Sequence, residues 1–315
     1  MELNKMLCSR LPLLPLLLLV VSCKESPHAP KSPPEPLATK TVTGQGEKPL
    51  SKQFKEYWYS GEAEITSYTL TQARYGELRD GHSVLVYVTE PFSAAEQVKA
   101  DNPDSSAVPV LKLNTTKNFL TGIYPYSIMS SSFHPVQGEG HALKVSNSVQ
   151  EWCGHVYAQL NNREQFEIRS HSYFESEGDR NFQLEPAHLE DEIWNKIRID
   201  TASLPTGTIK MIPSLEYTRL SHKELKGYEA MATLTTTDSI SVYTVIYPQL
   251  ERSLAIHFTT DFPHGIERWT ESYPSGFGTK AKVLFSTAVK KKRIKTPYWQ
   301  QNGNSDLFLR DSLGL

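Results

Sequence analysis

Cysteine is scarce in this chain, which has three cysteines in 315 residues: Cys8, Cys23 and Cys153. Cys8 lies in an N-terminal segment with the features of an export leader, and Cys23, directly after it, would carry lipid, so Cys153 would be the only free thiol of the mature chain. An intramolecular disulfide is therefore excluded, and an exported protein without one depends on a large hydrophobic core. The chain after position 50 is long enough to build such a core.

Long hydrophobic runs are also absent. The longest, Leu11–Val21, has eleven residues, whereas a membrane-spanning helix needs about 20. Lys5 and Arg10 precede this run, and a small residue and Cys23 follow it. Bacterial lipoprotein signal peptidase accepts this pattern, so we predict that residues 1–22 are removed and that Cys23 receives acyl chains such as palmitate. The lipid would hold the protein on a membrane without crossing it. The alternative is an ordinary secretory signal with an incidental cysteine.

An excess of charge of one sign is missing as well, because the formal net charge is −2. A general nucleic-acid binder needs a basic face to meet phosphates, so we expect no nucleic-acid partner. One basic run, Lys290–Arg293 with Lys295, stands out. It fits either added affinity for anionic lipids or an exposed or edge strand protected by lysines against aggregation, and the edge strand is favoured.

Known catalytic signatures are missing too. The sequence contains no GxSxG, HExxH, GxGxxG or P-loop motif. We therefore predict no cofactor and favour a protein that is not an enzyme, although a catalytic group assembled from distant strands stays possible.

A tether follows the leader. Residues 23–50 contain six prolines and no aromatic residue, a composition that does not bury enough surface to fold. As a flexible coil this segment reaches about 30 Å. Residues 51–315 are predicted to form a single β-rich domain held off the lipid surface.

In this domain apolar and polar residues alternate with a period near two, which predicts strands. A turn is expected at 79–81, and the predicted strands are Ala63–Tyr75, Ser83–Val88, Val108–Leu113, His141–Ser148, Val149–Leu160, Gln165–Phe174, Thr208–Leu220, Gly227–Thr236, Ser239–Tyr247, Ser253–Thr260 and Lys280–Val289. Two helices are predicted: His188–Arg198 from its apolar stripe and Ser93–Ala100 from its capping-box spacing. Short polar links favour antiparallel pairing. The predicted fold is mainly β, with one large curved antiparallel sheet, like half a barrel, and one or two packed helices.

The first candidate for chemistry is the segment Glu151–His155. On a continuous strand Glu151, Cys153 and His155 share one face, so a thiol would lie near an imidazole base. A buried structural thiol is the simpler interpretation. The second candidate is the acidic segment with Glu175, Glu177 and Asp179, whose oxygens suit a hard divalent cation. A solvated turn is the simpler interpretation there.

The chain resembles a family of exported Gram-negative lipoproteins often filed as "septum formation inhibitor Maf", in five segments: Tyr57–Phe92, Ile123–Met129, Val149–Leu160, Ser172–Asp179 and Leu189–Gly207. The label implies a nucleotide pyrophosphatase with an α/β fold and a Ser-x-Ser-Pro-Arg-Arg element, and this sequence contains no such element. No functional residue is carried over. The predicted strand order also resembles the half-open barrels of periplasmic lipoprotein carriers, in which a curved sheet with a helix lid shelters an acyl chain.

These observations predict an envelope lipoprotein held on a bilayer, preferably the outer membrane, through acylated Cys23. Its body would lie in the periplasm or at the cell surface and bind an apolar ligand, a glycan or a protein partner. Two alternatives stay open: a hydrolase that uses Cys153 and His155, and the septum inhibitor or nucleotide pyrophosphatase that the family label implies.

Overall fold

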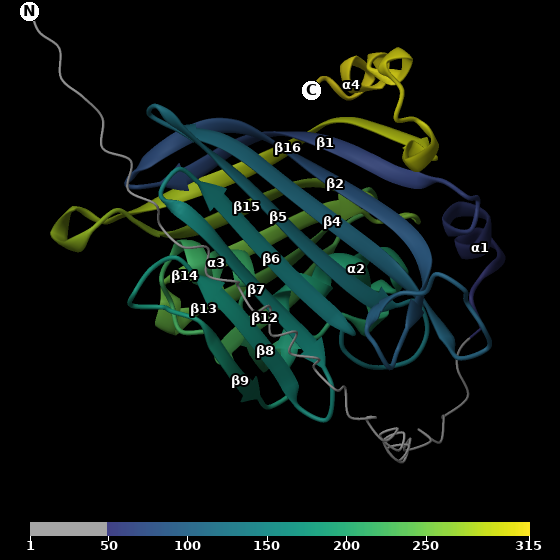
Figure 1. Cartoon of the computed structure of the whole chain (residues 1–315), viewed down its shortest axis with the longest axis horizontal. Helices are drawn as coiled ribbons and strands as arrows, with labels where there is room; N and C mark the ends of the chain where they lie inside the picture. Colours follow the sequence, from purple (N-terminus) through teal and green to yellow (C-terminus); the bar gives the residue numbers. More distant parts are fainter. Residues whose placement is uncertain (1–48) are drawn as a thin grey trace, which may run out of the picture. The chain divides into compact units, whose positions relative to one another are not determined.

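The computed structural model describes residues 49–315, so the predicted leader, Cys23 and most of the predicted tether lie outside the described residues. Sixteen strands form one sheet that is not closed into a barrel (Figure 1). The predicted mainly-β fold with one large antiparallel sheet is confirmed.

The strands are β1 (Ala63–Arg74), β2 (Glu77–Ser93), β3 (Val98–Lys99), β4 (Ala107–Thr121), β5 (Tyr124–Pro135), β6 (Lys144–Glu151), β7 (Gly154–Asn162), β8 (Phe166–Ser172), β9 (Arg180–Leu184), β10 (His188–Leu189), β11 (Gly207–Ile212), β12 (Tyr228–Thr236), β13 (Ile240–Tyr247), β14 (Arg252–Thr259), β15 (Ile266–Ser275) and β16 (Lys282–Thr296). The α-helices are α1 (Lys52–Trp58), α2 (Glu190–Ile199), α3 (Leu215–Leu220) and α4 (Phe308–Leu313).

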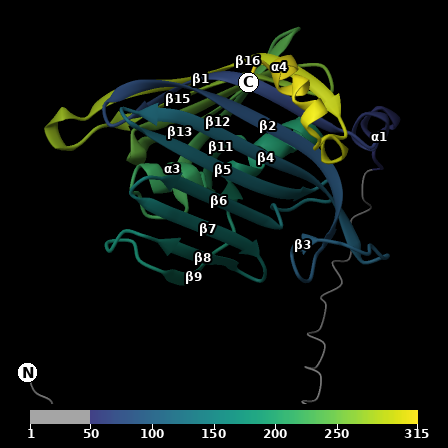
Figure 2. The same ribbon diagram turned by 45° about the horizontal axis from the view of Figure 1, so that its top comes forward.

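The sheet runs in the order β10-β11-β12-β13-β14-β15-β16-β1-β2-β4-β5-β6-β7-β8-β9, with β3 paired to β2. The short β10–β11 pair is parallel, and the other strands are joined as antiparallel neighbours. Figure 2 shows the strands following one another around a curve. Strands β9 and β10 form its two edges.

The antiparallel register brings seven connections to the same end of the sheet: 75–76, 122–123, 152–153, 173–179, 213–227, 248–251 and 276–281. We call this the hairpin end. Helix α1 lies at the opposite end, at the right of Figure 1, and we call that the α1 end.

Two local predictions fail at β2. The turn expected at 79–81 is wrong, because these residues pair within the β1–β2 ladder and the chain reverses at Tyr75 and Gly76, which both have positive φ. The helix expected for Ser93–Ala100 is also wrong. Ser93 Oγ does accept the Glu96 N–H at 3.2 Å, but this bond closes a single turn, after which β3 pairs back onto β2.

Two further differences from the predicted strands occur where the apolar pattern changes period or is interrupted by proline or serine. The strand expected for Thr208–Leu220 is half right, since β11 ends at Ile212 and α3 occupies the rest, with Ser214 Oγ accepting the Tyr217 N–H as its N-cap. Strands β5 and β15 were not predicted. Each contains proline near an end, and β5 contains a serine run, which reads as a loop composition.

The predicted helix His188–Arg198 is confirmed as α2, shifted by one or two residues. Ile193 and Ile197 are fully buried in the main core. This core contains side chains from strands on both sides of β1 in the sheet order. Figure 1 shows α2 behind the strands, within the curve of the sheet. The concave face is thus filled largely by this helix and by side chains.

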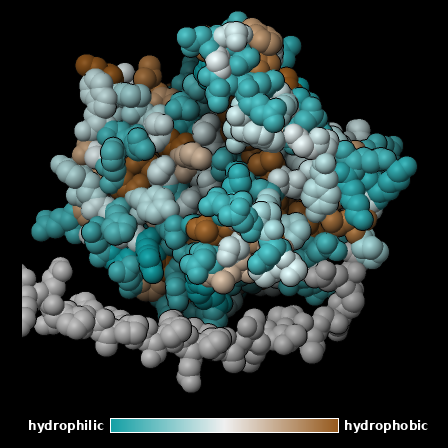
Figure 3. All heavy atoms as spheres, turned by 45° about the vertical axis from the view of Figure 1, so that its right-hand side comes forward, coloured by the Kyte–Doolittle hydropathy of each residue, from teal (hydrophilic) through white to brown (hydrophobic). Residues whose placement is uncertain are grey.

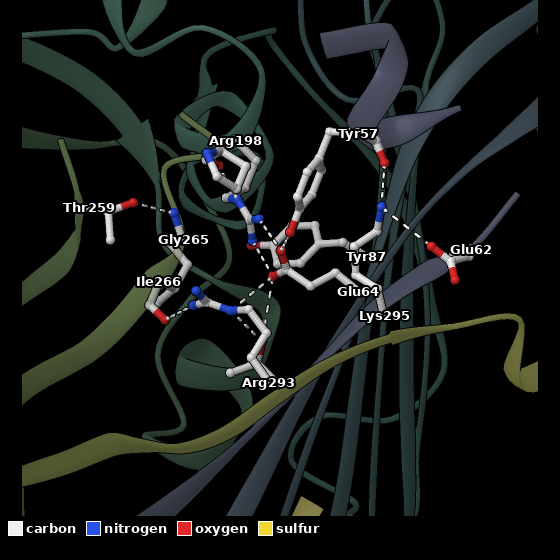
Figure 4. A network of polar contacts seen from close by, with 12 residues as sticks. Tyr57, Glu62, Glu64, Tyr87, Arg198, Thr259, Gly265, Ile266, Arg293 and Lys295 are labelled. Carbon is white, nitrogen blue, oxygen red and sulfur yellow. Dashed lines mark hydrogen bonds and ion pairs between the residues drawn. The ribbon is translucent and has the colours of Figure 1, made fainter. Parts of the chain in front are cut away.

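A buried ion pair fixes α2 to the sheet. Arg198 of α2 donates from Nη1 and Nη2 to the two carboxylate oxygens of Glu64 on β1, at 2.7 and 2.6 Å. Tyr57 also donates to this carboxylate, and Arg293 approaches it from β16 at 3.4 Å. Figure 4 shows these groups converging on Glu64 from α1, α2 and β16.

On the convex face, the end of the described chain folds back over the sheet. Leu313 of α4 packs with Ala63, Ile65 and Val88 in a small separate cluster. Figure 2 shows α4 lying over the outer surface near β1 and β2.

Candidate functional site

The segment around Cys153 is a hairpin turn, so the continuous strand expected for Val149–Leu160 is wrong. Strand β6 ends at Glu151, β7 begins at Gly154, and these two residues pair with each other. The turn has Trp152 and Cys153 at its two central positions. Neither is a typical turn residue, so sequence analysis did not detect the reversal. The common strand face expected for Glu151, Cys153 and His155 is lost with it.

The Cys153 thiol is exposed. Its backbone N–H donates to Glu151 Oε2 at 2.6 Å, and a hydrogen bond to the Glu151 carboxylate, with its charge, raises the pKa of the thiol. A nucleophilic cysteine needs the opposite shift, because the thiolate is the reactive form. Among residues 49–315 no hydrogen bond joins Cys153 to His155. This arrangement does not activate Cys153.

The three predicted cation ligands lie in one turn but point to different partners. Glu177 Oε1 accepts from His222 Nδ1 at 2.8 Å and from Arg219 Nη1 at 3.3 Å. Asp179 contacts a histidine of β8 at 3.3 Å, and Glu175 is exposed. In the described part of the chain the three carboxylates do not form a common ligand set. Arg219 and His222 supply the positive partners that the sequence could not place.

The basic run lies on β16, between β15 and β1, so it is not on an edge strand. Lys291 and Lys292 are exposed, which the same interpretation also allowed. Lys290 and Arg293 both pair with Glu267 on β15, and Lys295 lies 3.7 Å from Glu62. Several of these charges are therefore neutralised within the sheet.

A cavity of about 60 Å³ lies between the concave face and helices α2 and α3. Its wall is unusually rich in ionisable side chains for an interior, namely Lys117, Glu190, Asp191, Glu216, Arg252 and Glu271. The predicted interior was apolar. We call this space the charged cavity.

Most of these charges are paired. Arg252 donates to Glu190 through both Nη atoms, at 2.5 and 2.7 Å, and through Nε to Glu271 Oε1 at 2.7 Å. Lys117 Nζ lies 2.7 Å from Glu216 Oε1. The wall has four carboxyl groups and two cations, so the carboxyl groups outnumber the positive charges. Such a network rigidifies a core when every member is satisfied.

Asp191 is easier to protonate than an ordinary aspartate. Burial, followed by the charge of Glu190, raises the pKa of Asp191 to about 7. A carboxyl group with a pKa near neutrality is a candidate acid or base. However, small-molecule sites have volumes of about 300–1,000 Å³, and this cavity is far smaller. In this conformation it suits a few water molecules and no organic ligand.

Exposed apolar side chains gather at the hairpin end. The four most exposed large apolar side chains of residues 49–315 are Ile123, Phe277, Trp152 and Tyr173, with 81%, 70%, 68% and 68% of their surface accessible. All four lie in connections at this end. We call them, with Tyr75 and Tyr124 beside them, the hairpin rim.

The rim residues of adjacent connections touch. The rings of Tyr75 and Phe277 stack with centroids 5.6 Å apart, and those of Tyr124 and Trp152 lie 6.3 Å apart. Gly154 packs so closely against the Tyr173 ring that a Cβ atom there would overlap it. The exposed side chains therefore form a row along the sheet order. Figure 3 brings the α1 end forward and shows apolar patches scattered among hydrophilic residues.

Comparisons with family models, with curated proteins and with solved structures each found no match. In residues 49–315, no helix has both the length and the hydropathy that crossing a membrane requires. The described residues also lack the α/β architecture that the pyrophosphatase label implies.

The hairpin rim is not predicted from the sequence. Its available signal was an apolar residue beside glycine in a predicted link, as in Gly122-Ile123 and Phe277-Gly278. Single apolar residues in links are common and need no explanation. Only the register of the sheet shows that these links share one end.

Proposed function

We propose that this chain is a non-enzymatic lipoprotein of a Gram-negative cell envelope that binds a protein partner through the hairpin rim. Acylated Cys23 holds it on a membrane, preferably the outer membrane, with the body in the periplasm or at the cell surface. The proposed anchor follows from the leader sequence, and the binding role follows from the rim.

The observation that carries the binding role is the exposure of Ile123, Trp152, Tyr173 and Phe277 in one row. Exposed apolar side chains in a contiguous patch mark interaction sites, and tryptophan and tyrosine are common anchors of protein interfaces. A protein partner fits better than a small apolar ligand, because the charged cavity is too small for one. It fits better than a glycan because the most exposed side chain of the row, Ile123, is aliphatic.

The position of the rim supports presentation away from the anchor. The described chain begins beside α1, at the end of the sheet opposite the rim. Strand β2 alone has 17 residues, which span about 55 Å. A tether that joins at the α1 end leaves the rim free to meet a partner at a distance from the lipid surface.

Site-specific photo-cross-linking in intact cells tests this proposal. A photoreactive phenylalanine analogue is placed in the full chain at position 123, 152, 173 or 277, and at two controls of the α1 end, Trp299 and Phe308, which are also exposed. We expect one protein adduct of the same mass from at least two rim positions and none from the controls.

A second variant tests whether the apolar surface drives binding. Trp152→Ser with Phe277→Ser removes exposed side chains and leaves the core intact, so the adduct at position 123 should fall at least about tenfold. Adducts with lipid or glycan alone, or equal adducts from rim and control positions, would contradict a protein partner at the rim.

A further inference from the structure

A separate cluster of ionisable side chains lies where α2 begins. It consists of His141 in the loop between β5 and β6, His188 on β10 and Glu192 on α2. A ring nitrogen of each histidine and a carboxylate oxygen of Glu192 all lie within 4.8 Å of one another. Ligand atoms around a tetrahedral zinc ion are about 3.4 Å apart, given bonds of about 2.0–2.1 Å. A small inward movement of the three side chains would bring these atoms to that spacing.

The elements that hold the cluster are well fixed. Glu192 is fully buried and its carboxylate also accepts the backbone N–H groups of Ala142 at 2.8 Å and Leu189 at 3.3 Å. His141 Nδ1 lies 2.9 Å from Glu192 Oε1. The site therefore joins a loop, a strand and the first turn of a helix, with one ligand on each.

Two histidines in this region have ring nitrogens without a hydrogen-bond partner. In the described range 49–315, His188 Nδ1 and His134 Nε2 are buried and make no hydrogen bond. His134 is only 5% exposed, and the charge of Glu192 acts on its pKa, so the two side chains are close. A buried polar atom without a partner costs free energy. A cation coordinated by imidazole lone pairs would remove that cost.

One group competes with a metal. Lys196 Nζ lies 3.2 Å from Glu192 Oε1, four residues along the same helix. Its ammonium group supplies the positive charge that a cation would supply. Lysine has a long flexible side chain, so it can leave the carboxylate when a stronger cation arrives.

We propose that His141, His188 and Glu192 bind a divalent transition metal ion of the Zn²⁺ class. Two imidazoles and one carboxylate are a ligand set that zinc accepts, and three protein ligands leave a fourth coordination position. The inference goes beyond the proposed binding role, because the metal site is independent of the hairpin rim.

The test is titration of the purified full-length protein, stripped with chelator, with Zn²⁺ against a chromophoric competitor, together with the visible spectrum of the Co²⁺ form. We expect one ion per chain and an intense, tetrahedral-type Co²⁺ spectrum. His188→Ala should weaken zinc binding at least about 100-fold, whereas Lys196→Met, which removes the competing charge, should strengthen it several-fold.

A matched control separates this site from the acidic turn predicted from sequence. Glu177→Gln should leave zinc binding unchanged. Circular dichroism shows whether each variant folds, and if His188→Ala does not, Lys196→Met and the Co²⁺ spectrum decide. Failure of wild-type and Lys196→Met protein to bind Zn²⁺, a weak octahedral Co²⁺ spectrum, or equal affinity in folded His188→Ala would overturn the proposal.

Discussion

Arg198 and Glu64 form a bidentate ion pair whose two side chains are almost completely inaccessible to solvent. Glu64 lies on the strand at the centre of the sheet order, and Arg198 lies in the last turn of α2. The guanidinium group also packs over the rings of Trp58 and Tyr87, at 5.0 and 4.6 Å. This pair connects α1, α2 and the sheet (Figure 4).

Removing one partner of this pair should be costly. Glu64→Gln leaves the Arg198 charge buried without its carboxylate, and breaking a buried pair in this way costs about 3–5 kcal/mol. Urea unfolding monitored by circular dichroism measures the loss. The control is Glu62→Gln, two residues away and partly exposed beside Lys295, which should cost less than about 1 kcal/mol. Equal losses in the two variants would show that the buried pair has no special role.

The charged cavity predicts a pH dependence that belongs to Asp191. Its pKa is about 7 in the folded protein, against 3.8 for an ordinary aspartate. Because the folded pKa is raised, the stability that this group contributes is fully present below about pH 4 and is lost as the pH rises through 7. Asp191→Asn does not ionise and still accepts the Leu215 N–H through its side-chain oxygen.

The free energy of unfolding of Asp191→Asn should therefore rise relative to that of the wild type as the pH increases from 4 to 8. The difference should reach on the order of 2–4 kcal/mol at pH 8. Denaturant unfolding at successive pH values measures this difference. Asp311→Asn, which replaces an exposed aspartate, is the control and should show no such trend. A constant difference between Asp191→Asn and wild type across this range would mean that Asp191 titrates normally.

A side chain at Gly81 in β2 is predicted to lower the stability of the fold. A Cβ atom at this position would overlap the carbonyl oxygen of Asn118 on β4 and crowd Phe119, and the backbone of a central strand cannot easily move. Gly81→Ala should destabilise the fold by about 1–3 kcal/mol. Gly140→Ala is the matched control, since its Cβ would meet no described atom within 4 Å. Thermal unfolding of the two variants compares them, and similar melting temperatures would contradict the close approach.

Cys153 should react as an accessible but unactivated thiol. Native protein is expected to alkylate with iodoacetamide without denaturant, slowly at pH 7 and faster as the pH rises. Glu151→Gln removes the negative charge that raises the pKa of the thiol, so the rate at pH 8 should increase a few-fold. Rapid alkylation of the wild type at pH 6, measured by mass spectrometry, would instead favour the hydrolase that uses Cys153 and His155.

The strands and the helix that could be predicted from the sequence each have one buried face, which gives a regular apolar periodicity. The prediction of Ser239–Tyr247 corresponds to β13, whose alternate side chains are buried, and α2 follows from the apolar spacing of Ile193 and Ile197. Periodicity could not show the reversal at Trp152-Cys153, because an alternating pattern continues on both arms of a tight hairpin.

The charged cavity and the hairpin rim could not be predicted from the local sequence. Lys117 and Glu216 meet across the charged cavity although they lie 99 residues apart. The rim residues come from separate connections that only the strand register brings to one end. The chemistry of these places depends on tertiary contacts.

The proposed role depends first on the anchor, and the mass of the N-terminal peptide of protein purified from membranes tests it most directly. We predict that this peptide begins at Cys23 and carries the mass of attached acyl chains, and that Cys23→Ser leaves the leader uncleaved. A peptide that begins before residue 23, or an unmodified Cys23 thiol in the mature protein, would contradict the account.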